Sequence, residues 1–358
     1  MADASPIARA KSFAARFGLK MPILLAPMAG ACPPDLSIAV MASGAMGACG
    51  ALLMQPQEIT AWVAAVRRDA AASFQVNNWI PGRQVLRDRR REEQVARFLS
   101  TWGPAVDVDA LPLSQIDFDD QLEAMLAAAP PVMSSVMGLF DPAYVQRIKA
   151  AGIAWFAGVS TVTEARAAEA AGADVIVAQG SEAGGHRAAF NPERAAREAV
   201  GLLSLVPAIV NAVRVPVVAA GGIADGRTCA AALLLGASAV QIGTAFLRTP
   251  EAGIAAAWAA ALETAAPEDT VLTDAFSGRT GRSLATDFVK AATAADTPPP
   301  AAYPIQRALT AVMRAEGNRA NDLRRIQAWA GQSSALGRPC PAAALANGIW
   351  SDAQALLH

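Results

Sequence analysis

Residues 174–187 read DVIVAQGSEAGGHR and combine a strand with a glycine-rich loop. Residues 174–178 are mostly apolar and β-branched, which is the pattern of a short parallel strand covered on both faces. Gln179 ends this run, and Gly184 and Gly185 lack the Cβ atoms that keep other groups away from the backbone. The stretch therefore predicts a buried parallel strand that leads directly into a ligand-binding loop.

The residue after the two glycines is His186, and the only other histidine is the terminal His358. A single histidine in an arbitrary sequence is more often structural than catalytic. Its position after a strand of this kind makes His186 the candidate catalytic residue. The neighbouring Arg187 could either clamp an anion or lie solvated at the surface.

Apolar runs similar to 174–179 recur along the whole chain and alternate with Ala-rich segments of helical spacing. The expected strands are 23–29, 45–53, 73–79, 131–138, 153–159, 174–179, 215–220 and 239–246. The expected helices between them include 35–43, 56–69, 143–151, 163–171 and 229–235. Strict alternation predicts a parallel sheet of the α/β class, and eight units predict a closed (β/α)₈ TIM barrel.

Two segments are additions that a minimal (β/α)₈ barrel does not need. Residues 81–130, after the third strand, are far longer than an ordinary connection and contain a helical run, 83–99, whose interleaved charges indicate a solvated face. A helix expected over 250–264 is followed by a Pro-containing tail with further helical pattern. We expect a barrel domain, residues 1–262 with its insertion, and a helical C-terminal extension, 263–358, that packs on the barrel as a lid.

Composition narrows the possible partners. The net charge is −1 and the pI is near 6.2, so nucleic acid and membrane surfaces are not expected partners. The four cysteines form no CxxC pair, which argues against a disulfide framework and a thiolate metal site. With one internal histidine, we expect no metal site. A small-molecule substrate is the expected partner.

Two segments give information about the location of the protein in the cell. Basic residues interrupt residues 1–20 before an apolar signal core can form, so a short amphipathic helix is the simpler interpretation, with a transit peptide as the alternative on composition. Residues 228–247 are uncharged and long enough to span a membrane. Glycines and polar residues interrupt them, and we expect a helix, a turn and a strand instead. The predicted protein is cytoplasmic, as a monomer or weak homodimer.

The ends of the last two strands carry a pattern typical of phosphate binding. VVAAGG (217–222) ends in Gly221 and Gly222, and the next strand ends with Gln241, Gly243 and Thr244. Glycine turns expose backbone N–H groups, and the loops after strands seven and eight are the usual phosphate site of such barrels. The alternative is that the glycines only form tight turns. Asp225, just beyond them, fits a helix cap better than a ligand.

Three residues on earlier strands suit a flat heterocycle. Met28, within APMAG (26–30), offers a polarizable apolar wall, and Asn77 and Gln179 each offer an amide that can donate and accept. A phosphate site, two amides, an apolar wall and one histidine together suggest flavin mononucleotide, FMN.

Five motifs in combination resemble the nitronate monooxygenases, formerly called 2-nitropropane dioxygenases. They are LAPMAG (25–30), FQVN (74–77), AQGSEAGGHR (178–187), AAGGIADGR (219–227) and QIGTAFL (241–247). The resemblance extends to SGRTGR (277–282), the Tyr303-Pro304 pair and WAGQ (329–332). EAGGH and AAGGIADGR alone are less specific, because FMN-dependent enoyl-[acyl carrier protein] reductases share them.

The resemblance implies an FMN-dependent enzyme that oxidises alkyl nitronates, such as propionate 3-nitronate, with O₂ to a carbonyl compound and nitrite. His186 would be the catalytic residue, either holding the anion as imidazolium or acting as a neutral base. The residues expected at the cofactor are Met28, Asn77, Gln179, Gly184, Gly185, Gly221, Gly222, Gln241, Ile242, Gly243 and Thr244.

The chain departs from the expected pattern at two positions. Val136 stands where relatives are expected to carry a histidine or an aromatic residue, so the pocket should lose a polar contact there. Ala188 replaces an expected glycine.

Three other functions stay open at this point. The first is an FMN-dependent NAD(P)H reductase acting on an enoyl thioester or a quinone. The second is a flavin-free barrel of the IMP dehydrogenase type, which would need a loop cysteine that is missing between residues 153 and 229. The third is a barrel that stores or senses flavin.

Overall fold

The computed structural model describes residues 5–69, 73–82, 85–113 and 116–358. Within them, one parallel sheet has the strand order β1-β9-β8-β6-β5-β4-β3-β2. Its strands are β1 (Ile23–Leu25), β2 (Gly47–Gly50), β3 (Phe74–Trp79), β4 (Val132–Val136), β5 (Ala154–Val159), β6 (Val175–Gln179), β8 (Val217–Ala220) and β9 (Ala239–Ile242). A parallel bridge between Leu24 and Met46 joins the two end strands, and the Leu25 N–H donates to the Met46 carbonyl at 2.9 Å. The sheet is therefore a barrel, and the predicted fold class is confirmed.

Each predicted run contains one barrel strand, but several strands end early. Of residues 23–29, only Ile23–Leu25 are strand, because Pro27 cannot donate to the ladder. Of residues 239–246, Ala239–Ile242 are strand, and a 3₁₀ turn, η2 (Thr244–Arg248), follows. The residues released at these ends form the rim of the barrel.

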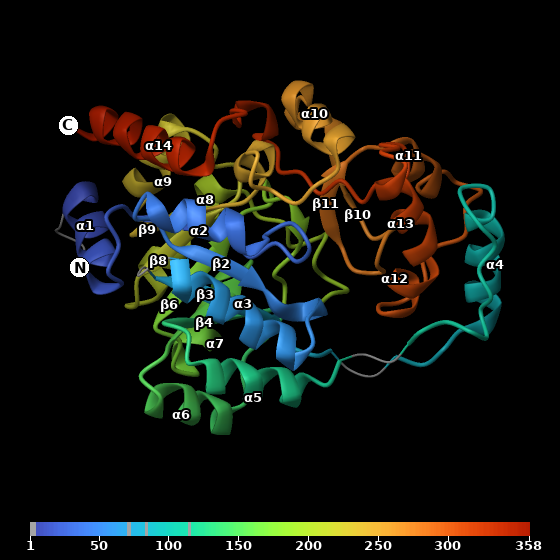
Figure 1. Ribbon diagram of the computed structural model, residues 1–358, viewed down its shortest axis with the longest axis horizontal. Coiled ribbons are helices and arrows are strands. Elements are labelled where there is room, and N and C mark those ends of the chain that lie inside the picture. The colour runs from blue at the N-terminus through green and yellow to red at the C-terminus, as the bar shows by residue number, and fades with distance from the viewer. Residues whose placement is uncertain (1–4, 70–72, 83–84, 114–115) are drawn as a thin grey trace.

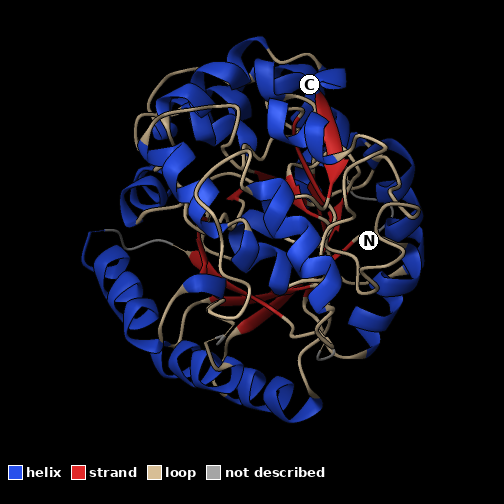
Figure 2. Cartoon of the chain, turned by 90° about the vertical axis from the view of Figure 1, so that its right-hand side faces the viewer, coloured by secondary structure: helices blue, strands red, loops and turns tan. Residues whose placement is uncertain are grey.

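Helices surround the barrel (Figures 1 and 2). They are α2 (Pro34–Ala42), α3 (Pro56–Asp69), α6 (Pro142–Ala150), α7 (Val162–Ala170), α8 (Leu202–Ala212) and α9 (Gly226–Leu234). Thr161 and Asp225 begin α7 and α9 with reciprocal capping boxes, so the predicted cap role of Asp225 is confirmed. The apolar helix α8, which contains Pro207, was not expected from the sequence.

The N-terminal helix α1 (Pro6–Arg16) is confirmed and closes the amino-terminal end of the barrel. Phe13 packs inside with the barrel strands, and the rings of Phe17 and Phe156 meet edge to face at 5.0 Å. Residues 228–247 form α9 and β9 rather than one long helix, as expected. In the part of the chain that is described, no helix has the length and apolar character needed to span a membrane.

The insertion after β3 contains two helices that pack on different parts of the molecule. α5 (Phe118–Ala128) packs on α3 of the barrel, while α4 (Arg89–Leu99) packs on α12 (Ile305–Leu309) of the extension (Figure 1). Residues 83–84 of the predicted run 83–99 lie outside the described residues. The prediction of a solvated charged face was wrong for Glu92, which is fully buried and receives a hydrogen bond from Arg87 Nε at 2.9 Å.

The C-terminal extension contains the expected helices and, in addition, two strands that the sequence did not indicate. β10 (Thr270–Thr273) and β11 (Gly281–Leu284) form an antiparallel sheet with β7 (Gly185–His186), which belongs to the loop after β6. The other elements are η1 (Ala51–Leu53), α10 (Ala256–Thr264), η3 (Pro267–Asp269), α11 (Asp287–Ala292), α12, α13 (Ala311–Arg319), η4 (Ser334–Leu336) and α14 (Ala342–Leu357). α14 returns to the barrel and packs on α9 and α2. The domain division at residue 262 stays a prediction.

Candidate active site

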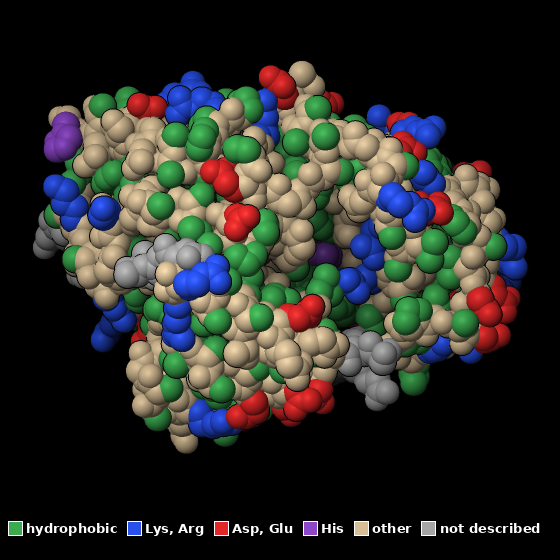
Figure 3. Space-filling view, viewed as in Figure 1, with side chains coloured by type: hydrophobic (Ala, Val, Ile, Leu, Met, Phe, Trp, Pro, Cys, Tyr) green, Lys and Arg blue, Asp and Glu red, His purple; other side chains and the backbone are tan. Residues whose placement is uncertain are grey.

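A cavity of about 630 Å³ lies at the carboxyl ends of the barrel strands. Its walls come from the loops after β1, β3, β4, β6, β8 and β9 and from the C-terminal extension. Figure 3 shows the hollow between the barrel and the extension, with a histidine at its bottom and basic side chains along one wall. Active sites of TIM barrels occupy this end of the fold, which makes the cavity the candidate active site.

All the predicted site residues except Ile242 line this cavity. The Ile242 side chain is 1% exposed and belongs to the hydrophobic core. Successive side chains of a strand point to opposite faces, so Gln241 faces the cavity while Ile242 points outward into the core. The expected contact through the Ile242 side chain is therefore not present.

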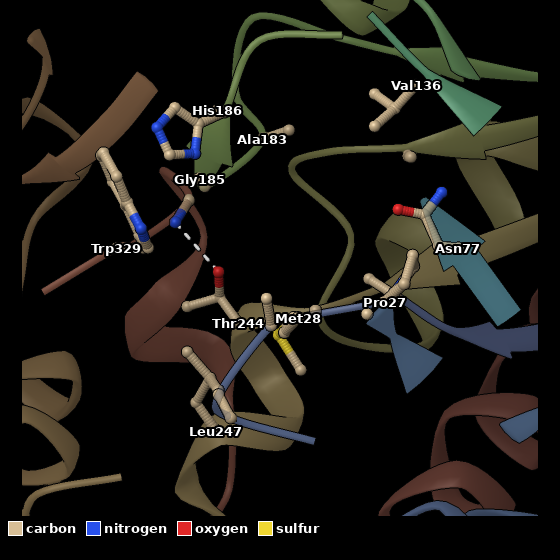
Figure 4. A pocket seen from close by; sticks show the side chains of 18 of the residues that line it. Pro27, Met28, Asn77, Val136, Ala183, Gly185, His186, Thr244, Leu247 and Trp329 are labelled. Atoms are coloured by element: carbon tan, nitrogen blue, oxygen red, sulfur yellow. Dashed lines mark hydrogen bonds between the residues drawn. The ribbon is translucent and has the colours of Figure 1, made fainter. Parts of the chain in front are cut away.

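His186 contacts two indole rings at the cavity wall, and Figure 4 shows it beside one of them, that of Trp329. The ring centroids of Trp79 and Trp329 are each 4.7 Å from that of His186, both edge to face. Its Nε2 is 2.7 Å from the hydroxyl of Ser277. The pairing of His186 with Gly281 across β7 and β11 fixes its backbone. With Nε2 engaged, Nδ1 is the ring nitrogen left for a ligand.

The surroundings of His186 favour the uncharged imidazole. Burial and the positive charges of Arg279, Arg307 and Arg314 lower its pKa from 6.5 to about 3. At neutral pH the ring is therefore neutral. Of the two roles left open by the sequence, holding an anion as imidazolium is not supported.

The loop before His186 touches a distant segment, and glycine is required there. A Cβ on Gly184 would lie 2.6 Å from the Gly331 nitrogen and 3.0 Å from Thr244 Oγ1. The Gly331 N–H donates to Thr244 Oγ1 at 3.0 Å, as the dashed line in Figure 4 marks. Three segments of the chain thus meet at one point of the cavity wall.

The glycine turn after β8 has the backbone conformation that the sequence predicted. Gly221 and Gly222 have φ values of +110° and +68°, which other residues rarely adopt. The Ser333 hydroxyl, from the segment after WAGQ, donates to the Gly222 carbonyl at 2.8 Å. Because Gly243 and Thr244 line the same cavity, both late turns face one space.

The two predicted amides are held differently. Asn77 Nδ2 donates to the carbonyl and the hydroxyl of Ser134, at 3.2 and 3.1 Å, and its oxygen is turned toward the cavity (Figure 4). Gln179 donates to the His186 carbonyl at 3.0 Å and accepts from the Ala188 N–H at 2.8 Å. Gln179 therefore orders the His186 loop, whereas Asn77 keeps an acceptor for a ligand.

The chain matches one known protein family over most of its length. The family model described as nitronate monooxygenase matches residues 11–352. The chain belongs to the nitronate monooxygenase family. A probable nitronate monooxygenase of Staphylococcus aureus strain Newman is 35% identical over 335 residues, which cover 92% of this chain and 94% of that protein.

Two solved structures are similar to this member of the nitronate monooxygenase family over nearly its whole length. A nitroalkane oxidase from Streptomyces ansochromogenes aligns with a TM-score of 0.87 and 34% identity, over 97% of this chain and all of that one. FabK from Thermotoga maritima aligns less closely, with a TM-score of 0.74 and 26% identity over 97% of this chain and 96% of that chain. Members of the nitronate monooxygenase family are flavin-dependent oxidoreductases that act on small molecules.

The two departures from the expected family pattern have different consequences. Val136 ends β4 and lines the cavity, so the wall is apolar at that position. Ala188 is 1% exposed, and its backbone N–H is the group that binds Gln179. The alanine methyl group fits its buried site, and the hydrogen bond to Gln179 does not require glycine.

For Arg187 in this member of the nitronate monooxygenase family, the prediction of a solvated side chain is wrong, and that of an anion clamp stays a prediction. The side chain is 2% exposed, so it is not solvated. Its guanidinium donates to the carbonyls of Gly180 and Gln179, at 2.6 and 3.0 Å, and its buried Nε has no partner within the described residues. Arg187 ties the end of β6 to the loop that follows it.

Sequence reasoning missed four residues of the site. Gln75 lines the cavity, and its Nε2 donates to the carbonyl of Leu25, but its buried Oε1 has no partner within the described residues. The others are Trp79, Ser277 and Trp329. Gln75, Ser277 and Trp329 lay in motifs noted for the resemblance, but nothing in the sequence indicated that Ser277 and Trp329 surround His186.

The residues present fit a flavin nucleotide. A cavity of about 630 Å³ is within the range of roughly 300–1,000 Å³ that is typical of ligand sites. The unpaired Gln75 oxygen and the Asn77 oxygen suit the N–H edge of a heterocycle, and the turn at Gly221 and Gly222 suits an anion. Met28 supplies the apolar surface, with its sulfur 3.4 Å from where a Cβ of Gly243 would lie.

Proposed function

We propose that this chain is an FMN-dependent nitronate monooxygenase that oxidises alkyl nitronates, such as propionate 3-nitronate, with O₂ to a carbonyl compound and nitrite. The observation that carries the proposal is the position of His186, which is neutral and contacts two indoles at the cavity lined by the family motifs. The relatives named nitronate monooxygenase and nitroalkane oxidase support it.

The proposed FMN site divides into a phosphate end and a ring end. Gly221, Gly222, Gly243 and Thr244 would hold the phosphate with their backbone N–H groups. Gly184, Gly185 and Gln241 would line the cofactor, with Met28, Gln75, Asn77 and Gln179 toward the ring. When bound, FMN would supply the electron transfer between the nitronate and O₂.

His186 would bind the nitronate as a neutral hydrogen-bond donor. The Ser277 hydroxyl lies 2.7 Å from Nε2 and 3.2 Å from the Arg279 carbonyl, and its single hydrogen can be donated to either acceptor. Donation to Nε2 would place the imidazole proton on Nδ1. An N–H group suits the negatively charged oxygens of a nitronate. The apolar surroundings strengthen this hydrogen bond because little water competes for it.

This arrangement also predicts which form of the substrate is used. A histidine with a pKa of about 3 is a weak base, so it would remove the α-proton of a neutral nitroalkane slowly. A nitronate has already lost that proton. We therefore expect nitronates to be preferred over the corresponding nitroalkanes.

The test starts from the purified holoprotein. We expect a flavin visible spectrum, release of FMN on denaturation, and nitrite formation from propionate 3-nitronate with O₂ uptake and without NADH. The corresponding nitroalkane, assayed before it ionises, should react much more slowly. Absence of nitrite release together with NADH oxidation by an enoyl thioester or a quinone would favour the reductase alternative.

The proposal also includes the cellular location and the oligomeric state of the protein. A cytoplasmic enzyme that works as a monomer or weak homodimer needs no residue from a partner at the cavity. Size-exclusion chromatography coupled to light scattering would measure the mass, and a stable larger assembly would contradict this part.

A further inference from the structure

One wall of the cavity is basic and lies outside the groups assigned to FMN. Arg307 of α12 and Arg314 of α13 line the same cavity as His186. Figure 3 shows basic side chains gathered on the extension side of the hollow. Both arginines come from the C-terminal extension, so the barrel and its extension each contribute a different part of the site.

Among the described residues, the arginines of this wall have no acidic partners. Within the described parts of the chain, no Asp or Glu forms an ion pair with Arg279, Arg307 or Arg314. A cluster of guanidinium groups without acidic partners at a cavity wall is suited to binding an anion. The positive charges also act together on His186, whose pKa all three lower.

Two of the three arginines are already held by neutral groups. Arg314 donates to Thr310 Oγ1, Gln327 Oε1 and the Arg307 carbonyl, at 3.1, 3.0 and 2.9 Å. Arg279 lies over the ring of Tyr303, 5.0 Å from its centroid. These contacts fix the two side chains in place without cancelling their charge.

Arg307 differs from both. No hydrogen bond or ion pair to its guanidinium is formed among the residues that the structure describes, although its side chain lines the cavity. A guanidinium presents paired N–H donors whose geometry matches a carboxylate. Arg307 is thus the member of the wall that is free to bind an anion.

We propose that Arg307 is a specificity-determining residue that binds the carboxylate of propionate 3-nitronate and so distinguishes this substrate from nitronates that lack a carboxylate. This inference rests on the proposed function, because it assigns the nitronate group to His186 and the second anionic group to Arg307. Arg314 and Arg279 add positive charge to the wall and support Arg307.

The test compares two nitronates of the same chain length on the holoenzyme. One comes from 3-nitropropionate and carries a carboxylate, and the other comes from 1-nitropropane and does not. Arg307→Gln should lower kcat/KM about 10- to 100-fold for the first, mainly through KM, and have little effect on the second. Arg307→Lys should recover part of the loss. The control is Arg319→Gln, at an exposed arginine of α13 that does not line the cavity.

A binding measurement separates this inference from the proposed function. Anaerobic calorimetry with 3-nitropropionate, whose nitro group is uncharged near neutral pH, reports on the carboxylate site without turnover. Weaker binding to Arg307→Gln, with no change for 1-nitropropane, would support the site even if neither nitronate were oxidised. Equal losses for both nitronates, or unchanged binding of 3-nitropropionate, would overturn it.

Discussion

His186 and Ser277 are joined by a 2.7 Å contact between Nε2 and Oγ, although 91 residues separate them in the sequence. The contact exists because β7, in the loop after β6, pairs with β11 of the C-terminal extension. Ser277 is held in turn by the Arg279 backbone, whose N–H lies 3.3 Å from its oxygen. The orientation of the only internal imidazole is therefore set by the extension rather than by the barrel.

Replacing Ser277 should change catalysis more than folding. Ser277→Ala removes the group that fixes the His186 tautomer, and one neutral hydrogen bond corresponds to about a 2- to 10-fold effect. We expect kcat/KM for propionate 3-nitronate to fall by that factor while the FMN content stays the same. Ser100→Ala, at the exposed end of α4, is the control. An unchanged kcat/KM would show that Ser277 does not position the imidazole.

His186→Asn should separate cofactor binding from catalysis. Loss of a hydrogen bond to an anion should reduce kcat/KM for a nitronate about 10- to 100-fold, whereas the protein should stay yellow. The measurement pairs nitrite release with the visible spectrum, and His358→Asn at the chain terminus is the control. A variant that stays yellow and fully active would exclude the proposed role of His186.

The lowered pKa of His186 predicts how stability depends on pH. The unfolded chain binds a proton at this residue near pH 6.5, but the folded protein does so only near pH 3. The neutral ring therefore stabilises the fold fully above about pH 6.5, and this contribution is lost as the pH falls toward 3. Urea unfolding at pH 7.5 and 5.0 should show a larger decrease for the wild type than for His186→Asn. Equal decreases would mean that the pKa is not lowered.

Gly184→Ala should damage the cofactor site and the fold together. The added methyl group would lie 2.6 Å from the Gly331 nitrogen, and overpacking of this kind costs about 1–3 kcal/mol. We expect a lower Tm and a weaker FMN affinity, measured by thermal unfolding and by fluorescence titration of the apoprotein. Gly103→Ala, where a Cβ comes no closer than 3.4 Å to another atom, is the matched control. Normal FMN affinity in Gly184→Ala would contradict the close approach.

The order of strands and helices could be predicted from the sequence because it depends on local periodicity. The eight runs and the capped starts of α7 and α9 are visible in short windows of sequence. The helix α8 was missed because its apolar residues have no start signal, and its Gly201 cap makes no side-chain hydrogen bond. The strands of the extension were missed because β10 (TVLT) and β11 (GRSL) do not form long apolar runs that alternate with helical segments.

For the site, local motifs identified residues that line the cavity but not how they are held. The glycine turns and His186 follow strands, and parallel strands in a barrel present their carboxyl ends at one mouth, so these residues had to meet there. Gln179 and Arg187 have polar side chains whose partners are backbone groups of the same loop. Their structural role depends on loop conformation, which the residue types do not specify.

By itself the sequence determined the barrel fold, the end of the barrel at which the cavity lies, and His186 as the candidate catalytic residue. It could do so because strand periodicity and glycine turns depend on neighbouring residues. Only the tertiary structure decided the charge state and surroundings of that imidazole. Trp79, Ser277 and Trp329 come from separate segments, and so do the arginines that lower its pKa. Burial and charge depend on distances in space, and packing of the extension onto the barrel sets those distances.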